Sequence, residues 1–292
     1  MGFTKRSDLI IPQLLVEAIQ GEFAGKKLLY GTGAVVTSDT LPCDKRGGDT
    51  VTVPYFGTLG EADDIATEGD ALTPEGINET SETATVVHSG KAFETTEWAR
   101  MAANSDPYVE AARQLRIIME RRFDKALIDV ATASLPGSYV NDVTGTPGQQ
   151  LTYDVVADST GLWGDQQENI VLIGVHSKVY RDLLKLKDST GRNLLTMPSY
   201  GPEGFKPASI YGVPVIVSDK CKVVAGSPNK YETLLIKSDA LALWMAEAPK
   251  VKVGDDILAD TNLIATHFYF APYRYKRVRG STHPGVIKIV TF

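Results

Sequence analysis

Residues 106–135, which read DPYVEAARQLRIIMERRFDKALIDVATASL, carry the longest helical pattern in the chain. Asp106 is a good N-cap, and Pro107 suits the first helical position, where its missing N–H is not needed. Pro136 and Gly137 then end the pattern. We expect one uninterrupted helix of about 45 Å, with one apolar stripe formed by Tyr108, Ala112, Leu115, Met119, Phe123, Ala126, Leu127 and Val130.

Upstream of this helix, residues 47–98 predict a long β-hairpin. The first leg, Asp49–Tyr55, alternates with a period of two, so its Val and Tyr side chains share one face. Pro54 cannot donate to a ladder, which makes this leg an edge strand or a free hairpin leg. A second extended run covers residues 82–94. The intervening segment of about 25 residues is too long for a structureless loop in a compact domain, and we expect it to lie on another molecule.

The predicted hairpin is strongly acidic. It contains eleven Asp and Glu residues and the single basic residue Lys91, whereas the whole chain has a net charge of −6, so the remaining residues carry +4. We therefore expect the hairpin to lie across a basic surface of a neighbouring copy. The candidate contact residues are Glu61, Asp63, Asp64, Glu68 and Asp70 in the hairpin, and Arg113, Arg116, Arg121 and Arg122 on the long helix.

The remaining segments predict an arm and an α/β unit. Residues 1–46 contain a short amphipathic helix over Leu9–Ile19 and a turn at Gly31–Gly33, and we expect this arm to have little core of its own. After the long helix the pattern alternates between helix and strand. Helices are expected over 152–162 and 176–187, a loop over 197–207, and strands at 170–173, 213–217, 233–236, 241–245, 251–253, 263–275 and 286–291.

Composition excludes several classes of protein. The 292 residues are 43% hydrophobic and 23% charged, which is ordinary for a globular chain. The acidic balance argues against a nucleic-acid binder driven by bulk charge. No apolar run approaches the roughly 18 residues that span a bilayer, and residues 1–20 do not have the pattern of a secretory signal, so we expect a soluble cytosolic product. Cys43 and Cys221 are expected to be free thiols.

No arrangement of catalytic or metal-binding residues emerges. The four histidines lack metal-ligand spacing, and no nucleophile elbow, P-loop or dinucleotide-binding motif occurs. Asp255 and Asp256 are expected in a turn. The basic run Arg274–Arg279 interleaves aromatic and charged residues as an RNA-binding strand can, but an intersubunit or structural charge cluster is favoured. We expect no enzymatic activity, catalytic residue, metal or cofactor.

The order of these elements resembles the major capsid proteins of tailed bacteriophages, which share the Hong-Kong-97-type fold with encapsulins. Gly48–Tyr55 is similar to the first leg of that family's extended loop, and Ala66–Pro74 to its distal part. Ser105–Pro107 opens what would be the spine helix. Tyr211–Val215, followed by Ser218 and Asp219, is similar to a strand of the axial domain.

The resemblance implies an α+β fold and a shell-forming function. The parts would be an N-terminal arm (1–46), an extended β-hairpin loop (47–98), a peripheral domain with the spine helix and a β-sheet (99–135 and 247–280), and an α/β axial domain (136–246 and 281–292). Pentamers and hexamers of the chain would enclose double-stranded DNA without sequence-specific binding or membrane contact. Scaffolding, portal and decoration proteins would be separate partners, and no cross-link through Lys91 is expected.

Two alternatives stay open at this point. An encapsulin-type nanocompartment would use the same fold around enzyme cargo. A monomeric α/β hydrolase or transferase would need a nucleophile–base pair, which the sequence does not offer. The capsid interpretation places the protein in the virion, with assembly in the cytoplasm of the host bacterium.

Overall fold

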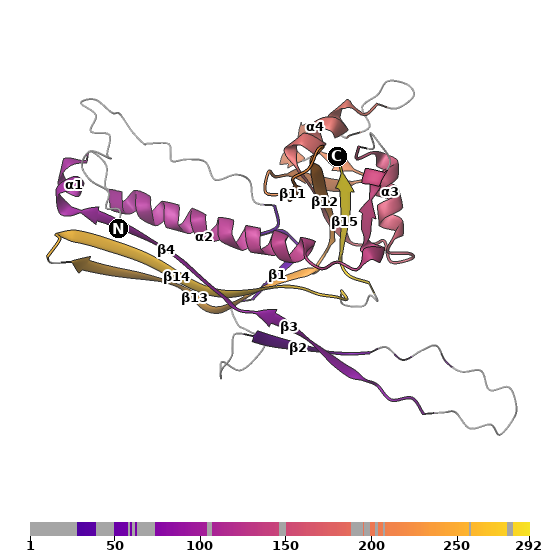
Figure 1. The fold of residues 1–292 in the computed structure, drawn as a ribbon, viewed down its shortest axis with the longest axis horizontal. Coiled ribbons are helices and arrows are strands. Elements are labelled where there is room, and N and C mark those ends of the chain that lie inside the picture. The colour runs from indigo at the N-terminus through magenta and orange to yellow at the C-terminus, as the bar shows by residue number, and fades with distance from the viewer. Residues whose placement is uncertain are drawn as a thin grey trace, which may run out of the picture.

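The computed structural model describes residues 28–38, 50–57, 59, 62, 74–103, 107–145, 150–187, 195, 199–201, 204–206, 208–256, 258–278 and 283–292. Figure 1 shows that the long helix α2 lies along a slender sheet, that a second sheet with two helices stands at its C-terminal end, and that a two-stranded hairpin projects from the body. The predicted helix over Leu9–Ile19 and the N-cap Asp106 lie outside the described residues.

Helix α2 spans Pro107–Thr132, 26 residues, or about 39 Å. It begins at the predicted proline but ends before Leu135, because Ser134 adopts a left-handed φ of 46°. Most of the predicted stripe is confirmed. Leu115, Phe123, Ala126 and Leu127 are buried, as are Ile128 and Ala131, while Met119 and Val130 are half-buried. The side chains of the other two predicted members, Tyr108 and Ala112, lie outside the described part.

Four strands form the slender sheet beneath α2, in the order β1-β13-β14-β4. Phe268 and Phe270 of β14 meet the Phe123 ring edge-on, with centroids 5.3 and 4.9 Å apart. Short helix α1 (Glu97–Ala102) follows β4 at the far end of the sheet. The strands are β1 (Val35–Ser38), β13 (Leu241–Asp256), β14 (Thr261–Arg274) and β4 (Val87–Thr96).

Two of the expected strands are one. The prediction of separate strands at 241–245 and 251–253 was wrong, because β13 continues through both and pairs with β14 along its length. Its register shifts on either side of Glu247, which accommodates the stretch that contains Pro249. The prediction that Asp255 and Asp256 lie in a turn was wrong, because both pair at the end of β13, opposite Asn262 and Thr261. The turn follows them, and Asp256 accepts hydrogen bonds from the amides of Leu258 and Ala259 at 2.9 and 3.3 Å.

The second sheet has seven strands, six of them in the order β5-β15-β12-β6-β10-β9, and β11 pairs with β12. Helices α3 (Tyr153–Gly161) and α4 (Ser177–Lys185) cover one face, where they pack on Leu235 and Ile173. The strands are β5 (Val140–Asp142), β15 (Val286–Thr291), β12 (Lys230–Lys237), β6 (Ile170–Val175), β10 (Val213–Val217), β9 (Ser209–Ile210) and β11 (Val223–Val224).

The opposite face of this sheet packs against the C-terminal half of α2 and against residues 28–35. Alternation along β12 sends Leu234 and Ile236 to this side, into one core with Phe123. Gly174 of β6 allows close packing here, because a Cβ would lie 3.0 Å from the end of the Leu28 side chain. One continuous core therefore joins the two sheets.

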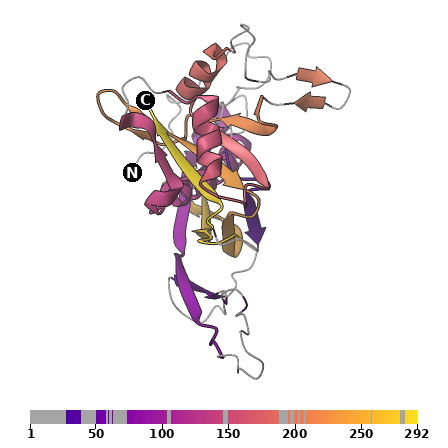
Figure 2. The same ribbon diagram turned by 90° about the vertical axis from the view of Figure 1, so that its right-hand side faces the viewer.

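Two short 3-10 helices flank β5: Gly137–Tyr139 links α2 to that strand, and Val143–Gly145 follows it. The prediction of a loop over residues 197–207 was wrong in part, because β7 (Ser199–Gly201) and β8 (Gly204–Lys206) form an antiparallel pair within it. This small pair projects from the body at the end opposite to the long hairpin (Figure 2).

The predicted β-hairpin is present at its base. Strand β2 (Thr50–Phe56) pairs antiparallel with β3 (Glu79–Thr85), and the two form a separate two-stranded sheet. The second extended run is two strands rather than one: β3 pairs with β2, whereas β4 pairs with β14. Val51 and Ala84 pack on Trp244 and Tyr273, which belong to the sheet face turned away from α2. We call that face the outer face.

Arg274 closes the C-terminal end of α2. Its guanidinium donates hydrogen bonds to the carbonyl oxygens of Ala133 at 2.5 Å and Ser134 at 3.1 Å, and approaches that of Ala131 at 3.4 Å. The last carbonyl groups of a helix have no partners within it, and a cation at this end also complements the helix dipole. The end of β14 thus fixes the end of α2.

Replacing Arg274 with Met keeps most of the aliphatic stem and removes the donors. We expect the free energy of unfolding of the unassembled subunit, measured in urea, to fall by about 2 kcal/mol. The matched control is Arg277→Met. The Cζ atom of Arg277 lies 6.0 Å from the centroid of the Tyr55 ring, and this contact should contribute only about 0.5 kcal/mol. Equal losses in the two variants would contradict the capping role.

Candidate functional site

The structure separates the predicted contact residues into two groups. The acidic candidates Glu61, Asp63, Asp64, Glu68 and Asp70 all lie outside the described residues. The four arginines lie on α2 within the described part, so the expected meeting of the two groups stays a prediction. The structure does show which ion pairs and ring contacts these arginines make within their own subunit.

Arg113 and Arg116 have partners one turn away on α2. Arg113 donates to Glu110 at 2.6 and 2.8 Å, and this hydrogen bonding lowers the pKa of the Glu110 carboxyl to about 2. Arg116 lies 3.6 Å from Glu120, one turn further along α2. Such exposed pairs are worth only about 0.2–1 kcal/mol. Both arginines can exchange these partners for a neighbour's carboxylates at little loss.

Arg121 and Arg122 differ from each other. Arg122 is half-buried, and its guanidinium lies 5.6 Å from the centroid of the Phe270 ring. Arg121 is exposed, and among the residues that the structure describes no ion pair involves it. Of these two arginines, Arg121 is the more exposed.

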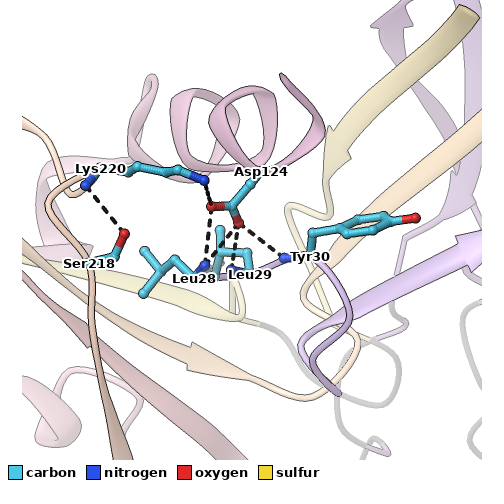
Figure 3. Close-up of polar contacts among 6 residues, drawn as sticks. All are labelled: Leu28, Leu29, Tyr30, Asp124, Ser218 and Lys220. Atoms are coloured by element: carbon cyan, nitrogen blue, oxygen red, sulfur yellow. Dashed lines mark hydrogen bonds and ion pairs between the residues drawn. The ribbon is translucent and has the colours of Figure 1, made fainter. Parts of the chain in front are cut away.

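The polar centre of the subunit is Asp124, which the sequence analysis missed. Its side chain is fully buried. One carboxylate oxygen accepts the amides of Leu28, Leu29 and Tyr30 at 3.1, 2.8 and 3.1 Å, and the other accepts Leu28 at 3.1 Å and Lys220 Nζ at 2.9 Å (Figure 3). One side chain therefore joins α2, the segment before β1 and the loop after β10.

Burial of two leucines explains why a carboxylate is needed. Leu28 and Leu29 have no exposed surface, and buried amides without partners would destabilise the fold. Asp124 supplies the acceptor for three consecutive amides, and Lys220 balances its charge. The expectation that the arm has little core was therefore wrong for residues 28–38, which are part of the subunit core.

A signal for Asp124 was present in the sequence. Asp124 follows Phe123 and precedes Leu127 by three positions, so helical geometry places it beside the apolar stripe rather than on the polar side. A carboxylate in that position needs a partner. Its partners lie 94–96 residues away on both sides, and local periodicity cannot identify them.

Cys221 lies beside this site and is a free, buried thiol. Burial raises its pKa to about 12, so it stays protonated and unreactive. Cys43, the other predicted free thiol, lies outside the described residues.

A second buried carboxylate holds the hairpin to the outer face. Glu82 of β3 accepts a hydrogen bond from the Tyr273 hydroxyl and lies 3.1 Å from Lys276 Nζ. Burial and this bond raise the pKa of Tyr273. Together with Arg274 at the end of α2, these contacts confirm the structural interpretation of the basic run for two of its members, Arg274 and Lys276.

Large apolar side chains are exposed at two extremities. Trp98 and Met101 of α1 and Leu258 of the β13–β14 turn are 60, 70 and 98% exposed. At the distal end of the described hairpin, Phe56 and Ile77 are 67 and 58% exposed. No helix among the described residues is long and apolar enough to cross a membrane. Across the same described ranges, no cluster of three or more His, Cys, Asp or Glu could hold a metal ion.

Changing Asp124 to Asn keeps the shape of the side chain and removes the charge and half of the acceptors. We expect the subunit to lose about 3–5 kcal/mol of stability, the usual loss when one partner of a buried ion pair is removed. Hydrogen exchange at the amides of Leu28, Leu29 and Tyr30 should accelerate selectively. Lys220→Met should have a smaller effect, since the amide donors remain.

The matched control is Asp129→Asn, an exposed position one turn and a half further along α2, where a change of less than about 0.5 kcal/mol is expected. If Asp124→Asn is no less stable than this control, or if exchange of the three amides is unchanged, the anchoring role of Asp124 is wrong.

Comparison with known proteins agrees with this geometry. A model of the family described as "Phage capsid protein" matches residues 78–280. The major capsid protein of Bacillus phage SPP1 is 25% identical over 217 residues, which cover 68% of this chain and 65% of that protein. The alignment thus spans slightly less than two thirds of this relative.

Solved structures show the same fold. The capsid of Ralstonia phage GP4 superposes with a TM-score of 0.66 and 11% identity, covering 96% of each chain. The capsid of a native GTA particle gives a TM-score of 0.70 and 14% identity, covering 97% of this chain and 95% of that one. The mixed helix and sheet architecture is therefore the capsid fold expected from the sequence, and the chain belongs to the phage capsid protein family.

Proposed function

We propose that the chain is the major capsid protein of a tailed phage, which assembles through pentamers and hexamers into the icosahedral shell around double-stranded DNA. The observation that carries this proposal is the family match over residues 78–280, which covers most of the chain. The family is structural, so no catalytic role is proposed. The related GTA particle's capsid is described with fivefold symmetry, as pentamers require.

The extremities of the subunit are the surfaces that contact neighbours. The β2–β3 sheet has only two strands, and both of its outer edges lack a partner strand within the described chain. Unpaired edges readily bind another chain. The exposed Phe56 and Ile77 on the hairpin, and Trp98 and Leu258 at the far end of the sheet, supply apolar contacts.

For the parts of the subunit we propose the division expected from the sequence: arm (1–46), extended loop (47–98), peripheral domain (99–135 and 247–280) and axial domain (136–246 and 281–292). Strands β1 and β4 fall outside the proposed peripheral ranges, although they pair in the same sheet as β14. Strand β13 crosses from the axial into the peripheral part. The four-stranded sheet with α2 supports the peripheral assignment, and the seven-stranded sheet with α3 and α4 supports the axial one.

The remaining partners are part of the same proposal. Scaffolding, portal and decoration proteins would be separate chains, the finished protein would reside in the virion, and assembly would take place in the host cytoplasm. The family match and the SPP1 relative favour the phage shell over the encapsulin-type compartment.

Shortening the hairpin tests the intersubunit role. Gly57 donates to the carbonyl of Asn78 at 2.8 Å, so residues 58–77 can be replaced by Asn-Gly, which favours a tight two-residue turn. The described residues in the removed stretch are exposed. We therefore expect the stability of the subunit to change by less than about 1 kcal/mol, whereas large particles should disappear in sedimentation velocity.

The matched control keeps the hairpin at full length and changes Glu61, Asp63, Asp64, Glu68 and Asp70 to the corresponding amides. Loss of assembly only in the shortened variant assigns the contact to backbone and apolar groups, and loss in both assigns it to charge. Normal particles from the shortened variant would contradict the intersubunit role of the hairpin.

Arg121 tests the electrostatic part of this contact. Arg121→Glu should slow assembly at 50 mM salt, and the difference from the wild type should vanish at 1 M, where the Debye length is about 3 Å. Arg122 is left unchanged because it packs on Phe270 within the subunit. The control is Lys125→Glu, an exposed position on α2 that is not a candidate contact residue, and it should assemble like the wild type at both salt concentrations. An Arg121→Glu variant that assembles normally at both salt concentrations would remove the electrostatic account.

A further inference from the structure

Two histidines face each other on the outer face of the four-stranded sheet. His88 lies on β4 and His267 on the adjacent strand β14, and Nε2 of His88 is 3.4 Å from Nδ1 of His267. The ring centroids are 5.5 Å apart. Because the two nitrogens are much closer than the centroids, the nitrogen-bearing edges of the rings are turned toward each other.

The strands hold this pair in place. In the ladder, His88 is opposite Tyr269 and His267 is opposite Gly90, so the histidines are diagonal neighbours. The Tyr269 ring stacks on His88 with a centroid separation of 4.3 Å and an interplanar angle of 11°. A Cβ on Gly90 would lie 2.6 Å from the Thr266 carbonyl oxygen and 3.2 Å from His267 Nδ1. Glycine at position 90 therefore leaves open the side of His267 on which His88 approaches.

We propose that His88 and His267 bind one divalent first-row transition-metal ion. With metal–nitrogen bonds of about 2.0–2.1 Å, a nitrogen separation of 3.4 Å gives a ligand angle of about 110°, which suits tetrahedral Zn²⁺. Both imidazoles bind in the neutral form, with the proton of His88 on Nδ1 and that of His267 on Nε2. Metal binding therefore excludes the direct hydrogen bond between the two rings, because both facing nitrogens must offer a lone pair to the ion.

The site belongs to a defined chemical class. Imidazole nitrogen binds Zn²⁺, Ni²⁺ and Cu²⁺, whereas Mg²⁺ and Ca²⁺ prefer oxygen ligands. Two protein ligands leave the other positions to water, so the bound ion should exchange readily. The ion would cross-link β4 to the central strand β14. Strand β4 is the one that continues from the hairpin. This inference stands apart from shell assembly and can be tested on the unassembled subunit.

Calorimetric titration of the unassembled subunit with ZnCl₂ or NiCl₂ tests the site. We expect one ion per subunit, and at least a tenfold loss of affinity in both His88→Gln and His267→Gln. The ion should also raise the melting temperature of the wild type, because a ligand that binds only the folded state stabilises it, and this increase should be absent in both variants. MgCl₂ should give neither effect.

His176→Asn is the matched control, because His176 lies on the second sheet's helix α4 as an N-cap, a role that Asn can take over. It should bind the ion like the wild type. The proposal is overturned if the wild type binds no ion, if either His88→Gln or His267→Gln binds with unchanged affinity, or if His176→Asn loses binding to the same extent. Circular dichroism of each variant without metal verifies that it is folded.

Discussion

The buried carboxylate of Asp124 is the interaction on which the rest of the subunit depends. A charge without exposed surface is tolerated only when it is paired and fully hydrogen-bonded. Here three consecutive amides and Lys220 meet that condition. The carboxylate thereby fixes the position where β1 begins, holds two leucines in the core between the sheets, and ties α2 to the loop that follows β10 (Figure 3).

Around this anchor the four-stranded sheet has two faces with different tasks. Its inner face packs on α2 through the phenylalanines of β14, and Arg274 at the end of that strand closes the helix. Its outer face receives the base of the hairpin through Val51, Trp244 and the Glu82–Tyr273 bond. The packed sheets and α2 thus carry extended elements whose distal parts expose apolar and charged groups. A shell subunit needs such groups to contact its neighbours.

Local patterns in the sequence predicted much of this architecture. The three-and-four repeat located α2, and the period-two alternation located β2, because both signals arise within a few residues. Asp124 escaped notice because its partners are 94–96 residues distant. Pro249 suggests a break in β13, because proline cannot donate to a strand ladder. The register shifts that let pairing continue past Pro249 involve β14, and a local pattern in the sequence does not reveal them. The sequence also does not distinguish residues 28–38 from a free arm, because only the folded core shows where the adjacent Leu28 and Leu29 are buried. The candidate contact residues remain a prediction.

Electron cryo-microscopy of particles formed by the purified chain tests the central claim most directly. The account predicts closed shells in which the β2–β3 hairpin of each subunit lies against an adjacent subunit, while α2 and the Asp124 anchor keep one arrangement in every copy. A protein that stays monomeric at high concentration would contradict it, as would shells in which the hairpin contacts only its own subunit.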